Sequence, residues 1–256
     1  IRKIAGQFAY EEIRTPIFEK TDLFSRSVGT ETDIISKEMY SWADRDGSSL
    51  TLRPELTASV VRAFIQHNLG GKAPLQRLFY MGPLFRRERP QRGRQRQFHQ
   101  FGVEAFGSAH PEQDGEIISL AFSLLKALGL SDLSLNLNSI GSPECRKNYR
   151  NALQDFLRPF LSELSETSQK RFETNPLRIL DTKAAHEIEI IQNAPNITAF
   201  LTEEDQSHFE AVQSFLNALN IPFILDSKMV RGIDYYTRTT FEITSTSLGA
   251  QDALLG

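Results

Sequence analysis

Cysteine is almost absent from this chain, and long apolar runs are missing altogether. The single Cys145 excludes an internal disulfide framework, and no histidine stands at a metal-ligand spacing from it, so no metal site is predicted. Without a membrane-length apolar segment or a signal-peptide pattern, we expect a cytoplasmic protein with no membrane partner. The sequence also lacks a P-loop, a G-x-G-x-x-G turn and a G-x-S-x-G elbow, which excludes the commonest nucleotide-binding and hydrolase motifs.

A strong charge of either sign is missing too. The 256 residues carry a net charge of -3, and 40% of them are hydrophobic while 24% are charged. These proportions indicate a globular protein with one large domain, or a domain that carries an insertion. Any nucleic-acid contact must therefore come from a local basic patch, because the overall field is not cationic.

The most informative stretch is LFRRERPQRGRQRQFHQFGVE, residues 84–104. Its flanks, residues 77–86 and 97–106, are rich in aromatic and aliphatic side chains, while Pro90 and Gly93 interrupt the charged middle. This pattern predicts two strands joined by a loop.

Side chains two apart in a strand share a face. Alternation places Arg86 with Glu88 on the outgoing strand. On the returning strand it places together Phe98, Gln100, Gly102 and Glu104.

These side chains suit a nucleotide. An aromatic ring can hold adenine, an arginine can grip phosphate, and a carboxylate can bind a ligand that carries hydrogen-bond donors. A solvated charged hairpin is one alternative. A basic ribbon for nucleic-acid phosphates is another, formed by Arg87, Arg89, Arg92, Arg94 and Arg96.

The remaining chain mixes strands and helices without regular alternation, which favours an α+β fold with antiparallel pairing. We expect a short strand broken by Pro16 over residues 11–18, and a strand in LSLNLNSIG. Helices are predicted over residues 57–67 and 114–128, the second of them ending at Gly129. Residues 142–225 have mostly helical spacing and predict an insertion, in which Thr202 begins a helix. The predicted domains are thus residues 1–141 and 226–256 for the core, and 142–225 for the insertion.

Strand character resumes at residues 229–244, MVRGIDYYTRTTFEIT. Arg231 and Tyr236 are separated by an odd number of residues, so a regular strand sends them to opposite faces. If both serve one site, Gly232 is the candidate for a local irregularity between them.

Four segments in order resemble histidyl-tRNA synthetases, which are class II aminoacyl-tRNA synthetases, over essentially the whole chain. EEIRTPIFE resembles the first class II motif, and the hairpin resembles the second motif in its histidine-specific form. VRGIDYYTRTTFE is similar to the segment peculiar to histidine enzymes, and NPLRILDTK to the family's helical insertion. The resemblance implies an antiparallel sheet flanked by helices, and a homodimer formed through the Pro16 region.

The resemblance also implies a reaction and its site. Histidine is joined to ATP, with magnesium on the phosphates, and is then transferred to tRNA(His). Arg86 and Arg231 are implied as the catalytic pair around the α-phosphate, while Glu88 meets the adenine and Phe98 stacks on it. Histidine binding is implied for Glu55, Thr57, Gln100, Glu104, Arg231, Tyr235 and Tyr236. From the residues alone, Thr57 and Glu55 also fit a plain role at the start of a helix.

Three further expectations follow from the family pattern. After Gly256 the family continues with a third motif and an anticodon-binding domain, and the start at Ile1 also suits a segment of a longer protein. We therefore expect this stretch alone to charge tRNA inefficiently. The rival functions are a histidine-sensing regulatory paralogue of the synthetase, such as the accessory subunit of ATP phosphoribosyltransferase, and a plain nucleic-acid-binding module.

Overall fold

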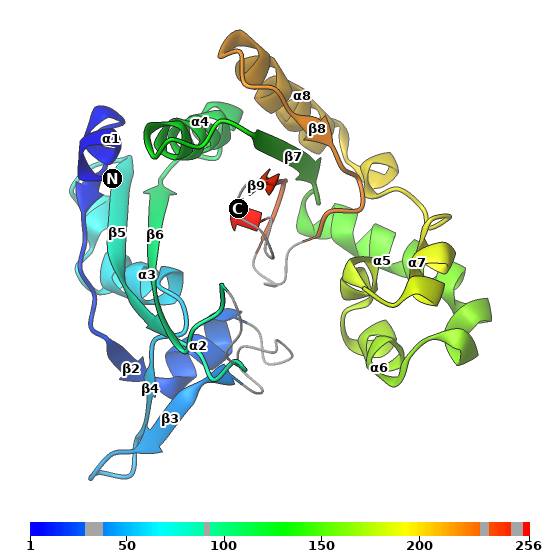
Figure 1. The fold of residues 1–256 in the computed structure, drawn as a ribbon, viewed down its shortest axis with the longest axis horizontal. Coiled ribbons are helices and arrows are strands. Elements are labelled where there is room, and N and C mark those ends of the chain that lie inside the picture. Colours follow the sequence, from blue (N-terminus) through cyan, green and yellow to red (C-terminus); the bar gives the residue numbers. More distant parts are fainter. Residues whose placement is uncertain (29–37, 90–92, 231–235, 247–252) are drawn as a thin grey trace. The chain divides into compact units, whose positions relative to one another are not determined.

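The structure, a computed structural model, describes residues 1–28, 38–89, 93–230, 236–246 and 253–256 (Figure 1). Its contacts divide the chain into two compact units. The first comprises Ile1–Gln113, Ser123–Leu128 and Ile233–Tyr235, and the second comprises Asp114–Phe122, Gly129–Gly232 and Tyr236–Gly256.

The first unit is built on the predicted hairpin. Strands β5 (Gln76–Phe85) and β6 (Gln97–Phe106) pair antiparallel along their whole length, and β1 (Glu11–Glu12) joins β5 in parallel. In Figure 1, β5 and β6 run side by side. A second sheet has the order β2-β4-β3, all antiparallel, with the bounds β2 (Phe18–Lys20), β3 (Tyr40–Ala43) and β4 (Ser49–Leu52). The helical elements are α1 (Arg2–Gln7), α2 (Thr21–Val28), α3 (Thr57–Gln66) and η2 (Leu69–Gly71).

Helix α3 packs its apolar face on the hairpin. Leu56 and Val60 lie in one buried cluster with Leu78, Tyr80 and Leu84 of β5. The helix begins at Thr57 as predicted and ends one residue before His67. Because Val60 and Leu84 are fully buried, this contact fixes the start of α3 against the sheet face that carries Glu104.

The second unit combines a four-stranded sheet with helices. The sheet order is β10-β9-β7-β8, and only the β7 to β8 pairing is parallel. The strands are β7 (Leu133–Ser139), β8 (Ile224–Leu225), β9 (Thr239–Ser245) and β10 (Ala253–Leu255). Helix α4 (Pro111–Ala127) is divided between the units. The other helical elements are α5 (Pro143–Leu157), η3 (Arg158–Glu163), α6 (Glu166–Thr174), η4 (Pro176–Asp181), α7 (Ala185–Ile191), η5 (Ile197–Phe200) and α8 (Glu203–Ala218). The α+β prediction is confirmed.

The predicted insertion has its own apolar core. Its fully buried members include Leu153, Leu157 and Ile179, and Cys145 lies among them. Burial raises the pKa of the Cys145 thiol to about 11, which agrees with a structural rather than a catalytic cysteine. The helical elements from α5 to α8 fall within residues 142–225, but the division into core and insertion domains stays a prediction.

Side chains cap the helices of this unit at their amino ends. The hydroxyl of Thr202 accepts from the amide of Asp205 at 3.1 Å, which confirms the predicted start of α8. Ser142 and Ser165 cap α5 and α6 in the same way. Each such cap contributes about 1 kcal/mol to stability.

Two predicted strands were wrong in their extent. Residues 11–18 contain β1 and only the first residue of β2, which continues to Lys20, and the two strands belong to different sheets. Of the residues predicted as a strand from Met229, the described ones before Thr239 are not in a strand, and β9 begins at Thr239. Met229 closes a turn on the carbonyl of Asp226, and Arg238 has a φ of 56°, which a strand does not allow. Gly232 lies outside the described residues.

Among the described residues, no helix combines the length and the apolar character needed to cross a membrane.

Glu187 is a buried carboxylate that ties α6 and η4 to α7. It accepts from the Ser165 amide at 2.7 Å, from the Ser168 hydroxyl at 2.9 Å and from the Thr182 hydroxyl. Burial alone raises its pKa, but these hydrogen bonds outweigh that effect and lower the pKa to about 2.

Replacing Glu187 tests this junction. We expect Glu187→Gln to lower the free energy of unfolding by about 2 kcal/mol at neutral pH, because an amide cannot accept all these bonds as a carboxylate does. The depressed pKa means that wild-type stabilisation is present above about pH 5 and is lost as the pH falls toward about 2. Urea unfolding between pH 3 and pH 8 measures the difference. Glu189→Gln, an exposed neighbour on α7, is the control and should change nothing.

Candidate functional site

The hairpin register brings the predicted side chains to one face. Across the ladder, Leu84 faces Phe98, Gly82 faces Gln100, Tyr80 faces Gly102 and Leu78 faces Glu104. Because alternate residues share a face, the even-numbered positions of both strands form one surface, which we call the site face. The face predicted for β6 is therefore the one that the structure has.

Arg86 and Phe98 meet at one end of the site face. The centre of the Arg86 guanidinium lies 5.2 Å from the centroid of the Phe98 ring. Its Nε donates to the carbonyl of Pro54 at 2.9 Å. Burial lowers the pKa of Arg86, while Glu88 and Glu38 favour its charged form. The Arg86 guanidinium is thus held beside the Phe98 ring, which was predicted to stack on adenine.

Glu88 lies beyond the end of β5, and its carboxylate and carbonyl both contact arginines that precede β6. Its carboxylate is 3.7 Å from Nε of Arg94, and its carbonyl accepts from Nε of Arg96 at 3.4 Å. The amide of Arg86 donates to the carbonyl of Arg96 at 2.9 Å, which carries the pairing past the strand ends. The structure therefore brings Arg86 and Glu88 close together, but by this local network rather than by strand alternation.

Two hydroxyl groups donate hydrogen bonds to the carboxylate of Glu104. Thr57 donates to its Oε1 at 2.7 Å and Tyr80 donates to the same atom at 3.0 Å. Burial raises the pKa of Glu104, and the two hydroxyls counteract part of that rise. The hydroxyl of Thr57 is thus directed at Glu104, and the predicted neighbours Thr57 and Glu104 are in contact.

Glu55 stands at the start of α3. Its carboxylate accepts from the amide of Ala58 at 3.0 Å and 3.3 Å, so it satisfies an amide of the first turn from ahead of Leu56, the residue that precedes the helix, and is not a first-turn acid. The side chain is buried, and burial raises its pKa to about 7, with a further contribution from the nearby charge of Glu104. The carboxylate of Glu104 on the site face therefore stands close enough to Glu55 to disfavour the ionisation of Glu55.

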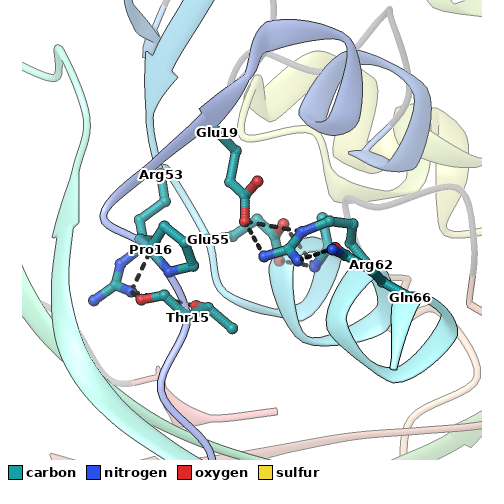
Figure 2. A network of polar contacts seen from close by, with 8 residues as sticks. Thr15, Pro16, Glu19, Arg53, Glu55, Arg62 and Gln66 are labelled. Carbon is teal, nitrogen blue, oxygen red and sulfur yellow. Dashed lines mark hydrogen bonds and ion pairs between the residues drawn. The ribbon is translucent and has the colours of Figure 1, made fainter. Parts of the chain in front are cut away.

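Arg53 connects the site to the Pro16 segment, as Figure 2 shows. Its Nη1 donates to the carbonyls of Thr15 at 2.9 Å and Pro16 at 3.2 Å, and its Nε donates to the carbonyl of Pro83 at 2.9 Å. Arg53 is buried, and burial lowers its pKa. A side-chain carbon at position 82 would overlap this guanidinium, so Gly82 makes room for it.

Beside this contact, a second network ties α3 to β2. Nε of Arg62 donates to Glu19 at 3.1 Å, and its Nη1 donates to Gln66 at 2.7 Å (Figure 2). The start of α3 is therefore held by Glu55 and its middle by Arg62.

For four other predicted site residues the contacts described above test no role. Gln100 lies exposed on the site face, opposite Gly82. Tyr236 belongs to the second unit, where it packs against the apolar core of the insertion. Arg231 and Tyr235 lie outside the described residues. The roles predicted for these four residues stay predictions.

The basic ribbon is exposed where it is described. Arg87, Arg89, Arg94 and Arg96 are exposed, and Arg92 lies outside the described residues. The guanidinium of Arg87 lies 5.9 Å from the ring of Tyr40, and Arg94 is paired with Glu88. The charge of Arg94 is therefore engaged in an ion pair within the hairpin.

Sequence reasoning missed Tyr80 and Arg53. Tyr80 shares the parity of Arg86 on the same strand, so the alternation that selected Arg86 could have selected it. The gap predicted at Gly102 is the space that the Tyr80 ring fills. Arg53 offered no such signal, because its partners are main-chain carbonyls.

A profile of the family described as histidyl-tRNA synthetase matches residues 1–255. The histidine–tRNA ligases of Protochlamydia amoebophila and Moorella thermoacetica are each 54% identical to the chain over 256 and 255 residues. Both alignments cover 100% of this chain and 60% of the relative, so the chain spans about 60% of the length of these curated relatives.

Solved structures agree with this likeness. The apo histidyl-tRNA synthetase of S. aureus superposes with a TM-score of 0.74 at 40% identity, covering 95% of this chain and 55% of that one. A Bacillus halodurans protein described as an ATP phosphoribosyltransferase regulatory subunit/histidyl-tRNA synthetase superposes with a TM-score of 0.67 at 22% identity, covering 97% of this chain and 67% of that one. The second likeness supports the fold alone.

The raised pKa of Glu55 gives a stability test. A folded-state pKa of about 7 lies above the ordinary value, so the contribution of Glu55 to wild-type stability is fully present below about pH 4.5 and is lost as the pH rises through about 7. Glu55→Gln keeps an acceptor for the Ala58 amide but cannot ionise. We expect its advantage over wild type to grow from about pH 4.5 to about pH 7, reaching on the order of 3 kcal/mol, and then to stay constant. Urea unfolding measures it.

Glu112→Gln, at an exposed position in the first turn of α4, is the matched control and should keep the wild-type pH dependence. A constant difference between Glu55→Gln and wild type at all pH values would contradict the assignment.

Proposed function

The chain belongs to the histidyl-tRNA synthetase family, and we propose that it forms catalytic machinery that activates histidine with ATP and passes it to tRNA(His). The observation that carries the proposal is the shared sheet face of Phe98 and Glu104, with the Arg86 guanidinium against Phe98 and the Glu55 carboxylate, ahead of α3, near enough to feel the charges of Glu104 and Arg86. Since the chain spans about 60% of its curated relatives, the activity proposed is that of the whole protein.

The charges of the site favour a ligand rich in donors. Burial raises the pKa of Glu55 to about 7, and the neighbouring Glu104 adds to the cost of its ionisation. A ligand that brings an ammonium group and an imidazole N–H offsets both negative charges. Histidine has both groups, at opposite ends of a short side chain.

We assign the histidine contacts accordingly. Glu55, Thr57 and Gln100 take the ammonium group, and Glu104 takes an imidazole nitrogen together with the segment that contains Arg231, Tyr235 and Tyr236. The 2.7 Å hydrogen bond from Thr57 to Glu104 supports the proposal that the two subsites are adjacent. Polar recognition of this kind discriminates against apolar amino acids by roughly 10⁴ to 10⁵.

ATP takes the other end of the face. Phe98 stacks on the adenine, Glu88 binds its edge, and Arg86 and Arg231 hold the α-phosphate from two sides. The guanidinium that already lies 5.2 Å from the Phe98 ring supports one clamp for ring and phosphate. Magnesium enters on the phosphates of ATP as part of the substrate.

The chemistry consists mainly of positioning. The histidine carboxylate attacks the α-phosphorus, the bond to the β-phosphate oxygen breaks, and pyrophosphate leaves with the electron pair. The nucleophile is already an anion, so we assign no general base. The arginines offset the charge that develops on the α-phosphate oxygens.

A homodimer through the Pro16 region belongs to the proposal. Ile17, Phe18 and Trp42 expose 45%, 51% and 41% of their surface on the β2-β4-β3 sheet, and the Phe18 and Trp42 rings meet edge to face at 6.0 Å. An exposed apolar group of this kind is typical of an interface. We propose the cytoplasm, where tRNA is charged, as the compartment.

Arg86 tests the ATP assignment. We expect Arg86→Gln in the natural full-length polypeptide to lower the rate of histidine-dependent exchange between ATP and pyrophosphate by about 10² to 10³, because a donor to the developing charge is lost. Arg87→Gln, the adjacent exposed arginine, should leave the rate nearly unchanged. No exchange by the wild-type polypeptide would instead favour a histidine-binding regulatory paralogue.

Phe98 separates an ATP site from a plain nucleic-acid module. We expect Phe98→Ala to weaken ATP binding by at least about tenfold, since a stacked base contributes about 1–3 kcal/mol, while RNA affinity changes little. Phe101→Ala, on the opposite face of β6 beside Phe79, is the control and should keep ATP affinity. Calorimetric titration measures both ligands. Unchanged ATP affinity in Phe98→Ala would count against the adenine site.

A further inference from the structure

Both hydroxyl groups at Glu104 approach the same carboxylate oxygen. Thr57 Oγ1 lies 2.7 Å and the Tyr80 hydroxyl 3.0 Å from Oε1, and the two hydroxyls are 3.3 Å apart. Each hydroxyl has one proton to give, and this geometry directs both protons to Oε1. Oε2 accepts no hydrogen bond from the residues that the structure describes, so the carboxylate is anchored by one oxygen only.

The position of Tyr80 depends on the residue across the ladder. Tyr80 is buried on β5 and faces Gly102 of β6. A side-chain carbon at position 102 would overlap the ring and its hydroxyl, so the ring lies over the glycine. The glycine therefore sets where the hydroxyl ends, and the hydroxyl ends at Glu104.

The surrounding charges explain why Glu104 needs such donors. Among the described residues, the titratable and charged groups on its side of the sheet include Tyr80, Glu55 ahead of α3, Arg86 beyond β5 and Arg53, whose guanidinium lies over Gly82. Glu55 repels a second negative charge, and burial also opposes ionisation of Glu104. Hydrogen bonds from Thr57 and Tyr80 favour the ionised form, and a carboxylate in that form only accepts.

We infer that Tyr80 is a positioning residue: with Thr57 it holds Oε1 of Glu104, so that Oε2 is presented as the acceptor for an imidazole N–H of bound histidine. This inference rests on the proposed function and deepens it. Tyr80 itself need not touch the substrate. Its hydroxyl acts through Glu104, and its ring supplies the packing.

Tyr80→Phe in the natural full-length polypeptide tests the hydroxyl, because phenylalanine keeps the ring over Gly102. We expect the KM for histidine in ATP and pyrophosphate exchange to rise about tenfold, the effect of one hydrogen bond to a charged group. The KM for ATP should stay at its wild-type value.

The pH profile separates positioning from packing. Without the Tyr80 donor the ionised form of Glu104 is less favoured, so the acidic limb of kcat/KM for histidine should move to higher pH. The titration of free histidine is common to all variants and cancels in the comparison.

Two further variants complete the design. Gly102→Ala keeps the hydroxyl but displaces the ring, and should shift the same limb in the same direction. In Tyr80→Phe, adding Gly102→Ala should produce little further shift, because both changes act through one contact. Tyr149→Phe removes a hydroxyl that donates to the carbonyl of Pro195 at 3.0 Å in the insertion, and should leave the limb in place.

The outcomes are distinct. An unshifted limb and an unchanged histidine KM in folded Tyr80→Phe would overturn the role of Tyr80 while leaving the synthetase activity intact. If Tyr80→Phe does not fold, Gly102→Ala decides the matter by the same two measurements. Absence of histidine-dependent exchange in the wild-type polypeptide overturns the proposed function itself.

Discussion

A buried guanidinium bound to main-chain carbonyls holds the first unit together. Arg53 reaches Thr15 and Pro16 on one side and Pro83 on the other, and its own carbonyl accepts from the amide of Phe85 at 3.1 Å. The next two residues continue the connection: the carbonyl of Pro54 accepts from Arg86, and the Glu55 carboxylate accepts from an amide in the first turn of α3. Three consecutive residues thus tie the exposed edge near Pro16 to the arginine and the helix of the site. Because Arg53, Pro54 and Glu55 are consecutive, greater mobility of any one of them would weaken the contacts of the other two.

The site combines charges that the fold makes costly. Glu55 and Glu104 are held where burial disfavours ionisation, and Arg86 is held where burial disfavours its charge. Hydrogen bonds from Thr57, Tyr80 and the start of α3 offset part of this cost. Without a ligand, these buried charges are only partly compensated. A ligand with complementary charged and hydrogen-bonding groups completes the compensation, and a ligand without those groups does not, so the site discriminates between the two.

Sequence alternation was enough to predict the hairpin, its two strands and the shared face of Phe98, Gly102 and Glu104, because each depends only on residues close in the chain. The partnership of Tyr80 with Gly102 depends on cross-strand register, which alternation alone does not fix. The start of β9 at Thr239 follows a left-handed backbone at Arg238, which the sequence does not reveal because arginine rarely adopts that conformation. The contacts of Arg53 are with carbonyl groups, which every residue has, so no residue pattern could reveal them.

Cys145 can serve as a natural probe of the insertion, because its thiol is buried at the entry to α5. Its sulfur occupies the space over Gly141, whose φ is 64°, and both residues sit at the entry to α5. Since it is the only cysteine in the sequence and its thiolate is disfavoured by burial, an alkylating reagent can modify it only when the insertion opens. The rate of thiol labelling therefore reports local opening of the insertion, without any engineered probe and without background from a second thiol.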